Sequence, residues 1–175
     1  MDKSYADTVR LLLSVTPVVF ANDIFAMKGG TAINLFVRDM PRLSVDIDVV
    51  YTPWQHPREQ ALPAITAELN AVAGRVAKLG LTARAVPSKD LGDTKLLIED
   101  ESSQIKVEVN VVFRGTVLPT ERRALSNRTA QMFSAELEVP VLAPSELYGS
   151  KLVAAMDRQH PRDLFDVWQM FESDG

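Results

Sequence analysis

One segment alternates between polar and apolar side chains: Ser44-Val45-Asp46-Ile47-Asp48-Val49-Val50-Tyr51. Because successive side chains of a strand point to opposite faces, the pattern predicts a strand over residues 44–51 with Asp46 and Asp48 on one face, their Cα atoms about 6.6 Å apart. Two carboxylates so placed repel each other, and a hard cation such as Mg²⁺ relieves the repulsion. The segment therefore predicts a metal site, with a solvated acidic face as the alternative.

A glycine-rich turn, Lys28-Gly29-Gly30-Thr31, precedes this strand. The apolar run 24–27 predicts a strand that enters the turn, and residues 31–37 have helical spacing. A turn at a helix start presents backbone N–H groups to an anion, although paired glycines also occur in turns that bind nothing. Next to Asp46 and Asp48, the turn would place phosphate recognition beside metal recognition, which phosphoryl transfer needs.

The remaining pattern predicts helices and strands on both sides of these two motifs. A helix over 3–15 should end before Pro17, because proline breaks helices. The other expected elements are a helix over 57–80, a strand over 81–86 and a hairpin of 95–98 with 105–113. If the strand over 105–113 lies beside the strand over 44–51, Glu108 supplies a third carboxylate to the metal site.

The C-terminal third is predicted to end in two helices, which open at Pro144 and Pro161. In the second helix, the apolar spacing predicts a buried stripe of Leu164, Phe165, Trp168 and Phe171, with Asp163 and Asp166 on the opposite face. The preceding segment is interpreted as a loop that offers RNA a phosphate track or is simply solvated. Its basic residues are Arg114, Arg122, Arg123 and Arg128.

Composition limits the function classes further. The chain has 175 residues, 46% hydrophobic and 24% charged, with no cysteine. We expect one α+β domain over 1–175, with a sheet-containing core over 1–143 and a helical pair over 144–175. The lack of cysteine excludes a disulfide scaffold and a thiol nucleophile. The net charge of −4 argues against a surface that attracts nucleic acid everywhere. Residues 11–20 are too short an apolar run to span a bilayer, so we expect a cytoplasmic protein with no membrane partner.

Two blocks of the sequence resemble one known family. The first joins Lys28-Gly29-Gly30-Thr31-Ala32 to Arg42-Leu43-Ser44-Val45-Asp46-Ile47-Asp48. The second joins Leu142-Ala143-Pro144-Ser145-Glu146-Leu147 and Lys151-Leu152 to Pro161-Arg162-Asp163-Leu164-Phe165-Asp166. Both blocks, in this order, resemble the AbiEii/AbiGii-type toxin nucleotidyltransferases, a branch of the polymerase-beta-like superfamily that includes the MenT-type tRNA-modifying toxins.

The resemblance implies a nucleotidyltransferase fold, a mixed sheet flanked by helices. It implies that Asp46 and Asp48 hold Mg²⁺, with Mn²⁺ as the alternative ion, and that Ser44 lies beside this metal. Its other implied roles concern the nucleotide: Lys28, Gly29, Gly30 and Thr31 hold the triphosphate, Lys151 reaches the phosphates, and Asp166 completes the site with Asp163 in support. Superfamily enzymes commonly place an aspartate where this chain has Glu108.

By this resemblance, the function is transfer of a nucleoside monophosphate from an NTP to an acceptor hydroxyl, with tRNA 3′ ends as the expected acceptor. The protein would be the toxin of a toxin–antitoxin or phage-defence system and would have a cognate antitoxin. Two alternatives remain open from the sequence. One is a nucleotide-binding regulatory or interaction module that has lost turnover; the other is a transferase that modifies protein, with Ser44 or the antitoxin as its target.

Overall fold

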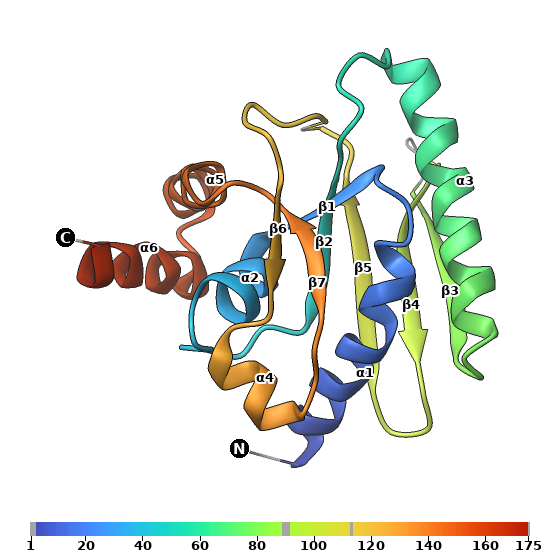
Figure 1. The fold of residues 1–175 in the computed structure, drawn as a ribbon. Coiled ribbons are helices and arrows are strands. Elements are labelled where there is room, and N and C mark those ends of the chain that lie inside the picture. Colours follow the sequence, from blue (N-terminus) through green and yellow to red (C-terminus); the bar gives the residue numbers. More distant parts are fainter. Residues whose placement is uncertain (1–2, 89–91, 113, 175) are drawn as a thin grey trace.

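A seven-stranded mixed sheet forms the centre of the computed structural model, which describes residues 3–88, 92–112 and 114–174 (Figure 1). The strand order is β3-β4-β5-β2-β1-β7-β6, so that β2 is the central strand. Neighbouring strands are antiparallel except for the parallel pairs β1–β7 and β2–β5. The strands are β1 (Phe25–Lys28), β2 (Asp46–Tyr51), β3 (Thr82–Ser88), β4 (Gly92–Glu99), β5 (Gln104–Asn110), β6 (Glu121–Ala124) and β7 (Glu138–Val141).

Helices flank this sheet, which confirms the expected α+β class and mixed sheet. The helices are α1 (Lys3–Val19), α2 (Gly29–Ala32) with the π-helix η1 (Ile33–Val37) directly after it, α3 (Arg58–Ala77), α4 (Asn127–Phe133), α5 (Pro144–Arg158) and α6 (Pro161–Asp174). Helices α1 and α3 pack on the β2–β5–β4–β3 part of the sheet, and α5 and α6 lie on the opposite side of the molecule from α3 (Figure 1). No helix of the described ranges is long and apolar enough to cross a membrane.

The hydrophobic core lies between the sheet and helices α1 and α3. On β2 and β5 the inward-facing residues alternate with polar ones: Ile47, Val49 and Val107 are fully buried, whereas Lys106 and Glu108 are partly exposed. A strand that buries every second side chain must present the others on its second face. The core packing of β2 therefore fixes the face on which Asp46 and Asp48 lie.

The predicted end of the first helix is wrong. Helix α1 continues to Val19 with Pro17 inside it. Pro17 has no N–H for the carbonyl of Leu13, but the chain stays helical because Val15 and Val19 on this last turn are fully buried. Packing against the core thus outweighs the local preference of proline to break a helix.

The segment interpreted as a basic loop is a loop at Arg114, but it forms a strand and a helix from residue 121 onward. Arg122 and Arg123 lie on β6, where they pair with Glu138 and Glu121, and Arg128 lies on α4. These pairs reduce the positive charge that the segment presents. Phe113, at the end of the strand predicted over 105–113, is outside the described residues, and the strand itself ends at Asn110.

The predicted orientation of the last helix is reversed. Asp163 and Asp166 are 1% exposed, whereas Leu164, Trp168 and Phe171 are 50%, 51% and 64% exposed. The acidic face of α6 points inward because buried cations on other elements contact it. The apolar stripe consequently lies on the surface, where Phe165 and Trp168 pack against each other with ring centroids 5.7 Å apart.

This orientation makes a prediction about stability. We expect Trp168→Gln to lower the free energy of unfolding by less than about 1 kcal/mol, as is usual at exposed sites. The control Leu147→Ala, at a fully buried position of α5, should lower it by about 2–5 kcal/mol. Urea denaturation of the purified variants measures both values. A loss above about 3 kcal/mol in Trp168→Gln, typical of a buried tryptophan, would contradict the orientation of α6.

Candidate functional site

The candidate site is built on the polar face of β2. Asp46 and Asp48 share this face, and both are partly exposed. The structure confirms that β5 lies beside β2, with Asp48 paired to Glu108 and Asp46 paired to Lys106 in parallel register. The two aspartates and the glutamate predicted from the sequence are therefore on adjacent strands and on the same face.

A row of charged residues crosses the sheet at Asp48. In the sheet register, Lys28 on β1 lies opposite Asp48 on β2. Glu108 on β5 lies opposite Asp48 on its other side and opposite Lys95 on β4. The two carboxylates thus lie between two ammonium groups. Glu108 already contacts two lysines, with its oxygens 2.9 Å from Lys95 Nζ and 2.7 Å from Lys106 Nζ.

These contacts bear on Glu108 as a third metal ligand. Although burial raises the pKa of Glu108, hydrogen bonds from Lys106 and Lys95 bring it below its usual value. Among the described residues, no group of three or more histidine, aspartate or glutamate side chains is arranged to hold a metal. The structure gives Glu108 two lysine partners, and its role as a ligand stays a prediction.

The charge at Asp48 is unfavourable in the protein alone. Burial, and then the like charges of Asp46 and Glu108, raise the pKa of Asp48 from 3.8 to about 6. Burial likewise lowers the pKa of Lys28, although the neighbouring Asp48 opposes that effect. A divalent cation at Asp46 and Asp48 would relieve the repulsion. Two carboxylates suit Mg²⁺, which usually takes one or two protein carboxylates and completes its coordination with phosphate oxygens and water.

The Gly-Gly turn lies directly against the acidic face. Gly29 has a φ of +76°, which glycine adopts at little cost, and a Cβ there would collide with the carboxylate of Asp48. At Gly30 a Cβ would lie 2.5 Å from Arg42 Nη2 and 2.9 Å from Ser44 Oγ. A side chain at Gly29 would displace the Asp48 carboxylate, and one at Gly30 would displace the Arg42 guanidinium. The turn therefore packs closely against Asp48 and the 42–44 segment.

Thr31 ties the turn to the start of β2. It is fully buried, and its hydroxyl lies 2.5 Å from the carbonyl of Asp46 and 3.0 Å from Ser44 Oγ. These internal contacts hold the turn and the strand together. The side chain of Thr31 thus has protein partners, and its role in binding triphosphate stays a prediction.

A buried ion cluster lies beside the acid pair. Lys151 Nζ is 2.8 Å from Asp163 Oδ1 and 3.1 Å from Asp166 Oδ2. Arg158 Nε contacts Asp163 at 2.7 Å, and Arg42 contacts Asp166 through two nitrogens. Although burial raises it, the hydrogen bonds from Arg158 and Lys151 bring the pKa of Asp163 to about 2.

This cluster is close enough to the acid pair to act on it electrostatically. Burial is the main cause of both pKa shifts, and the charge of Lys151 opposes the rise at Asp48 and adds to the fall at Lys28. The structure therefore brings the residues of the two sequence blocks together, as the resemblance implies. It also adds two residues to which the sequence patterns assign no role: Arg42, which lies in the first block, and Asn34, whose side-chain amide donates to the Gly30 carbonyl at 2.8 Å.

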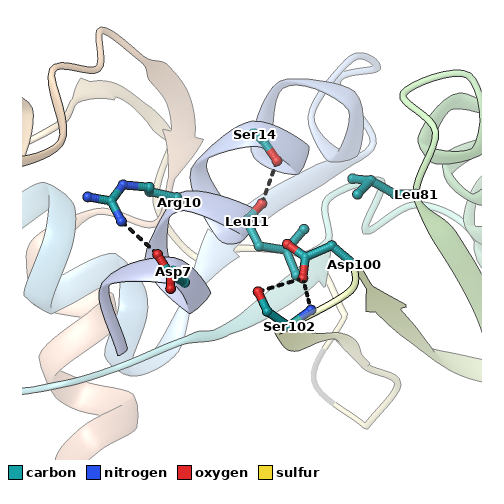
Figure 2. A pocket seen from close by; sticks show the side chains of 7 residues that line it. All are labelled: Asp7, Arg10, Leu11, Ser14, Leu81, Asp100 and Ser102. Carbon is teal, nitrogen blue, oxygen red and sulfur yellow. Dashed lines mark hydrogen bonds and ion pairs between the residues drawn. The ribbon is translucent and has the colours of Figure 1, made fainter. Parts of the chain in front are cut away.

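The pocket in Figure 2 is a different place on the molecule. Its volume is about 310 Å³, and it lies between α1 and the β4–β5 turn. Its polar groups have partners within it, since Arg10 pairs with Asp7 and Asp100 accepts hydrogen bonds from Ser102. None of the predicted site residues lines it. The lining residues are Asp7, Arg10, Leu11, Ser14, Leu81, Asp100 and Ser102.

A mixed sheet whose central strand carries two carboxylates against a Gly-Gly turn is the arrangement expected of the nucleotidyltransferase class. Residues 10–175 match the sequence model of the family described as "Nucleotidyl transferase AbiEii toxin, Type IV TA system". The chain therefore belongs to this family, and the resemblance seen in its two sequence blocks is confirmed.

A solved structure supports the same fold. The chain is similar to MenT4, a nucleotidyltransferase toxin from Mycobacterium tuberculosis H37Rv, with a TM-score of 0.62 and 20% sequence identity. The match covers 93% of this chain and 55% of that one, so the chain spans about half the length of the solved protein. A comparison with curated proteins found no match.

The raised pKa of Asp48 predicts a dependence of stability on pH. Because the folded-state pKa of about 6 exceeds the ordinary 3.8, the folded protein binds the extra proton between these values and loses stability as the pH rises through them. Without divalent metal, Asp48→Asn should be more stable than wild type at pH 8, by roughly 1–3 kcal/mol. The difference should vanish near pH 4.

Urea denaturation in EDTA at several pH values measures this difference. Glu101→Gln is the control, because it removes an exposed carboxylate away from the site and should change stability little. Lower stability of Asp48→Asn than of wild type at pH 8 would show that the carboxylate is not under electrostatic strain.

Proposed function

We propose that the protein transfers a nucleoside monophosphate from an NTP to an acceptor hydroxyl and releases pyrophosphate. The observation that carries this proposal is the close approach of Gly29 to the carboxylate of Asp48, which shares one face of β2 with Asp46. A glycine turn admits phosphate groups close to the backbone, and the adjacent carboxylates suit the metal that accompanies a triphosphate.

Asp46 and Asp48 would hold the divalent cation, either Mg²⁺ or Mn²⁺. When bound, it supplies positive charge that orients the triphosphate and stabilises the leaving pyrophosphate. The carboxylates of this chain keep the cation at the turn, and Ser44 lies next to them. Relief of the repulsion at Asp48 favours binding of the cation.

Cationic side chains of the chain would stabilise the phosphates. Lys28 enters the turn from β1, and Lys151 lies on α5 within electrostatic reach of Asp48. Lys151 is 7% exposed and is held by Asp163 and Asp166, which fixes its orientation before the nucleotide binds. Preorganised cations stabilise charge that develops during the reaction without a cost of reorientation.

We infer that the acceptor is the 3′ end of a tRNA and that a cognate antitoxin controls the protein, which acts as a toxin in the cytoplasm. Membership of a family described as a toxin of a toxin–antitoxin system supports the antitoxin. The tRNA acceptor rests on the resemblance to the MenT-type toxins. The net charge of −4 does not oppose an RNA acceptor, since bound cation offsets the acid pair.

One observation favours a second function, that of a nucleotide-binding module without turnover. Glu108 contacts Lys95 and Lys106, and the described residues contain no group of three acids or histidines arranged for a metal. If two carboxylates are too few for catalysis, the site would bind the nucleotide and stop there. Transfer onto protein, including Ser44, is a further outcome that the same assay detects.

The test is incubation of the protein with each labelled NTP, Mg²⁺ and total RNA. We expect label in RNA from the wild type and a loss of about 100-fold or more in Asp46→Asn, because removal of a metal-binding carboxylate removes several kcal/mol of charge stabilisation. Glu101→Gln should retain the wild-type rate. Label on protein would favour the protein-directed transferase, and binding without any transfer would favour the module.

A further inference from the structure

Arg42 lies at the glycine turn, and the sequence patterns assign it no role. Its Nη2 is 2.5 Å, and its Cζ 3.4 Å, from the place that a Cβ of Gly30 would occupy. Ser44 Oγ is 2.9 Å from that same place. The guanidinium therefore lies against the part of the turn that faces Ser44, and its side chain is 13% exposed.

Asp166 on α6 and the Leu43 carbonyl hold the guanidinium in this position, and Asn34 on η1 holds the Arg42 backbone. Nε and Nη2 of Arg42 donate to the two carboxylate oxygens of Asp166 at 2.6 and 2.5 Å, a bidentate contact with a fixed plane. Nη1 donates to the Leu43 carbonyl at 2.9 Å. The backbone N–H of Arg42 donates to Asn34 Oδ1, and Asn34 Nδ2 donates to the Gly30 carbonyl.

Two N–H donors of Arg42 remain after these contacts. A guanidinium carries five donors, and three are used by Asp166 and Leu43. In the described part of the chain, the other two, one on Nη1 and one on Nη2, have no acceptor. A phosphate group at the turn would supply acceptors of suitable geometry.

The buried groups of the cluster balance in charge. Arg42 and Lys151 are its buried cations, and Asp163 and Asp166 are its anions. Arg158 adds one positive group, but its side chain is 62% exposed and water screens it. An anion at the turn would therefore be bound through the free N–H donors of Arg42 and not through a net charge of the cluster.

We propose that Arg42 contacts the triphosphate of the nucleotide and that Asp166 is the positioning residue that orients it. The proposal rests on the proposed function for the identity of the ligand as a triphosphate. Asp166 is 1% exposed, and its oxygens are occupied by Arg42 and Lys151. It acts on the nucleotide through these two cations and not by contact with the metal or the acceptor.

The test is calorimetric titration of inorganic tripolyphosphate with Mg²⁺ into wild type and three variants. Arg42→Gln should weaken binding roughly 10- to 100-fold, because it removes charge-assisted hydrogen bonds. Asp166→Asn should weaken it about as much, because the carboxylate no longer fixes the guanidinium. Arg158→Gln is the matched control in the same cluster, and its affinity should stay within about threefold of wild type.

Arg42→Lys distinguishes contact of Arg42 with the phosphate from a purely structural role, in which Arg42 only joins Asp166 to the 42–44 segment. It keeps the charge but cannot form the bidentate fork, so binding should recover in part. The pair Arg42→Met with Asp166→Leu covers the case in which Arg42→Gln fails to fold, since apolar replacement of a buried ion pair commonly preserves stability. This double variant should fold, by circular dichroism, and still bind tripolyphosphate weakly.

Unchanged tripolyphosphate affinity in a folded Arg42 variant would overturn the proposal and leave Arg42 with a structural role only. An equal loss in Arg158→Gln would also overturn it, because the effect would then follow overall charge. Absence of tripolyphosphate binding by wild type would do the same. Arg42-dependent binding without nucleotidyl transfer would instead contradict the proposed function and leave the role of Arg42 standing.

Discussion

The site depends on one constraint, the alternation of side chains along β2. Ile47 and Val49 are fully buried in the core, so Asp46 and Asp48 have to share the opposite face. Because β2 is the central strand, its neighbours β1 and β5 bring Lys28 and Glu108 to the same row. The hydrophobic effect that stabilises the sheet thus also holds like charges together at Asp48, where burial and then these charges raise the carboxylate pKa.

The second half of the site depends on the buried charges of α5 and α6. Asp163 and Asp166 would be costly to bury alone, and Lys151 and Arg42 offset that cost. The same pairs join α6 to the 42–44 segment and to the turn, so the C-terminal helices are tied to the acid pair electrostatically. Their apolar surface residues, such as Trp168, face outward as a consequence.

The sequence pattern was enough to predict β2, the glycine turn and the neighbouring strand with Glu108. The alternation of polar and apolar side chains and the preference of glycine for turns are properties of residues that are adjacent in the sequence. The orientation of α6 was not predictable in this way. Its acidic face is buried because Lys151 on α5 and Arg42, far away in the sequence, supply partners for the two aspartates. Pro17 shows the same limit, since tertiary packing keeps α1 helical through it. The roles assigned to the site residues rest on the resemblance of the two sequence blocks to the family.

The central claim is that Asp46 and Asp48 form a metal site for the nucleotide at the glycine turn. Electron paramagnetic resonance of Mn²⁺, titrated into the protein with tripolyphosphate present, measures this occupancy directly. We predict a bound Mn²⁺ signal in wild type and in Glu101→Gln that is lost in Asp46→Asn and Asp48→Asn. Equal Mn²⁺ binding by wild type and by folded Asp46→Asn and Asp48→Asn variants would contradict the account.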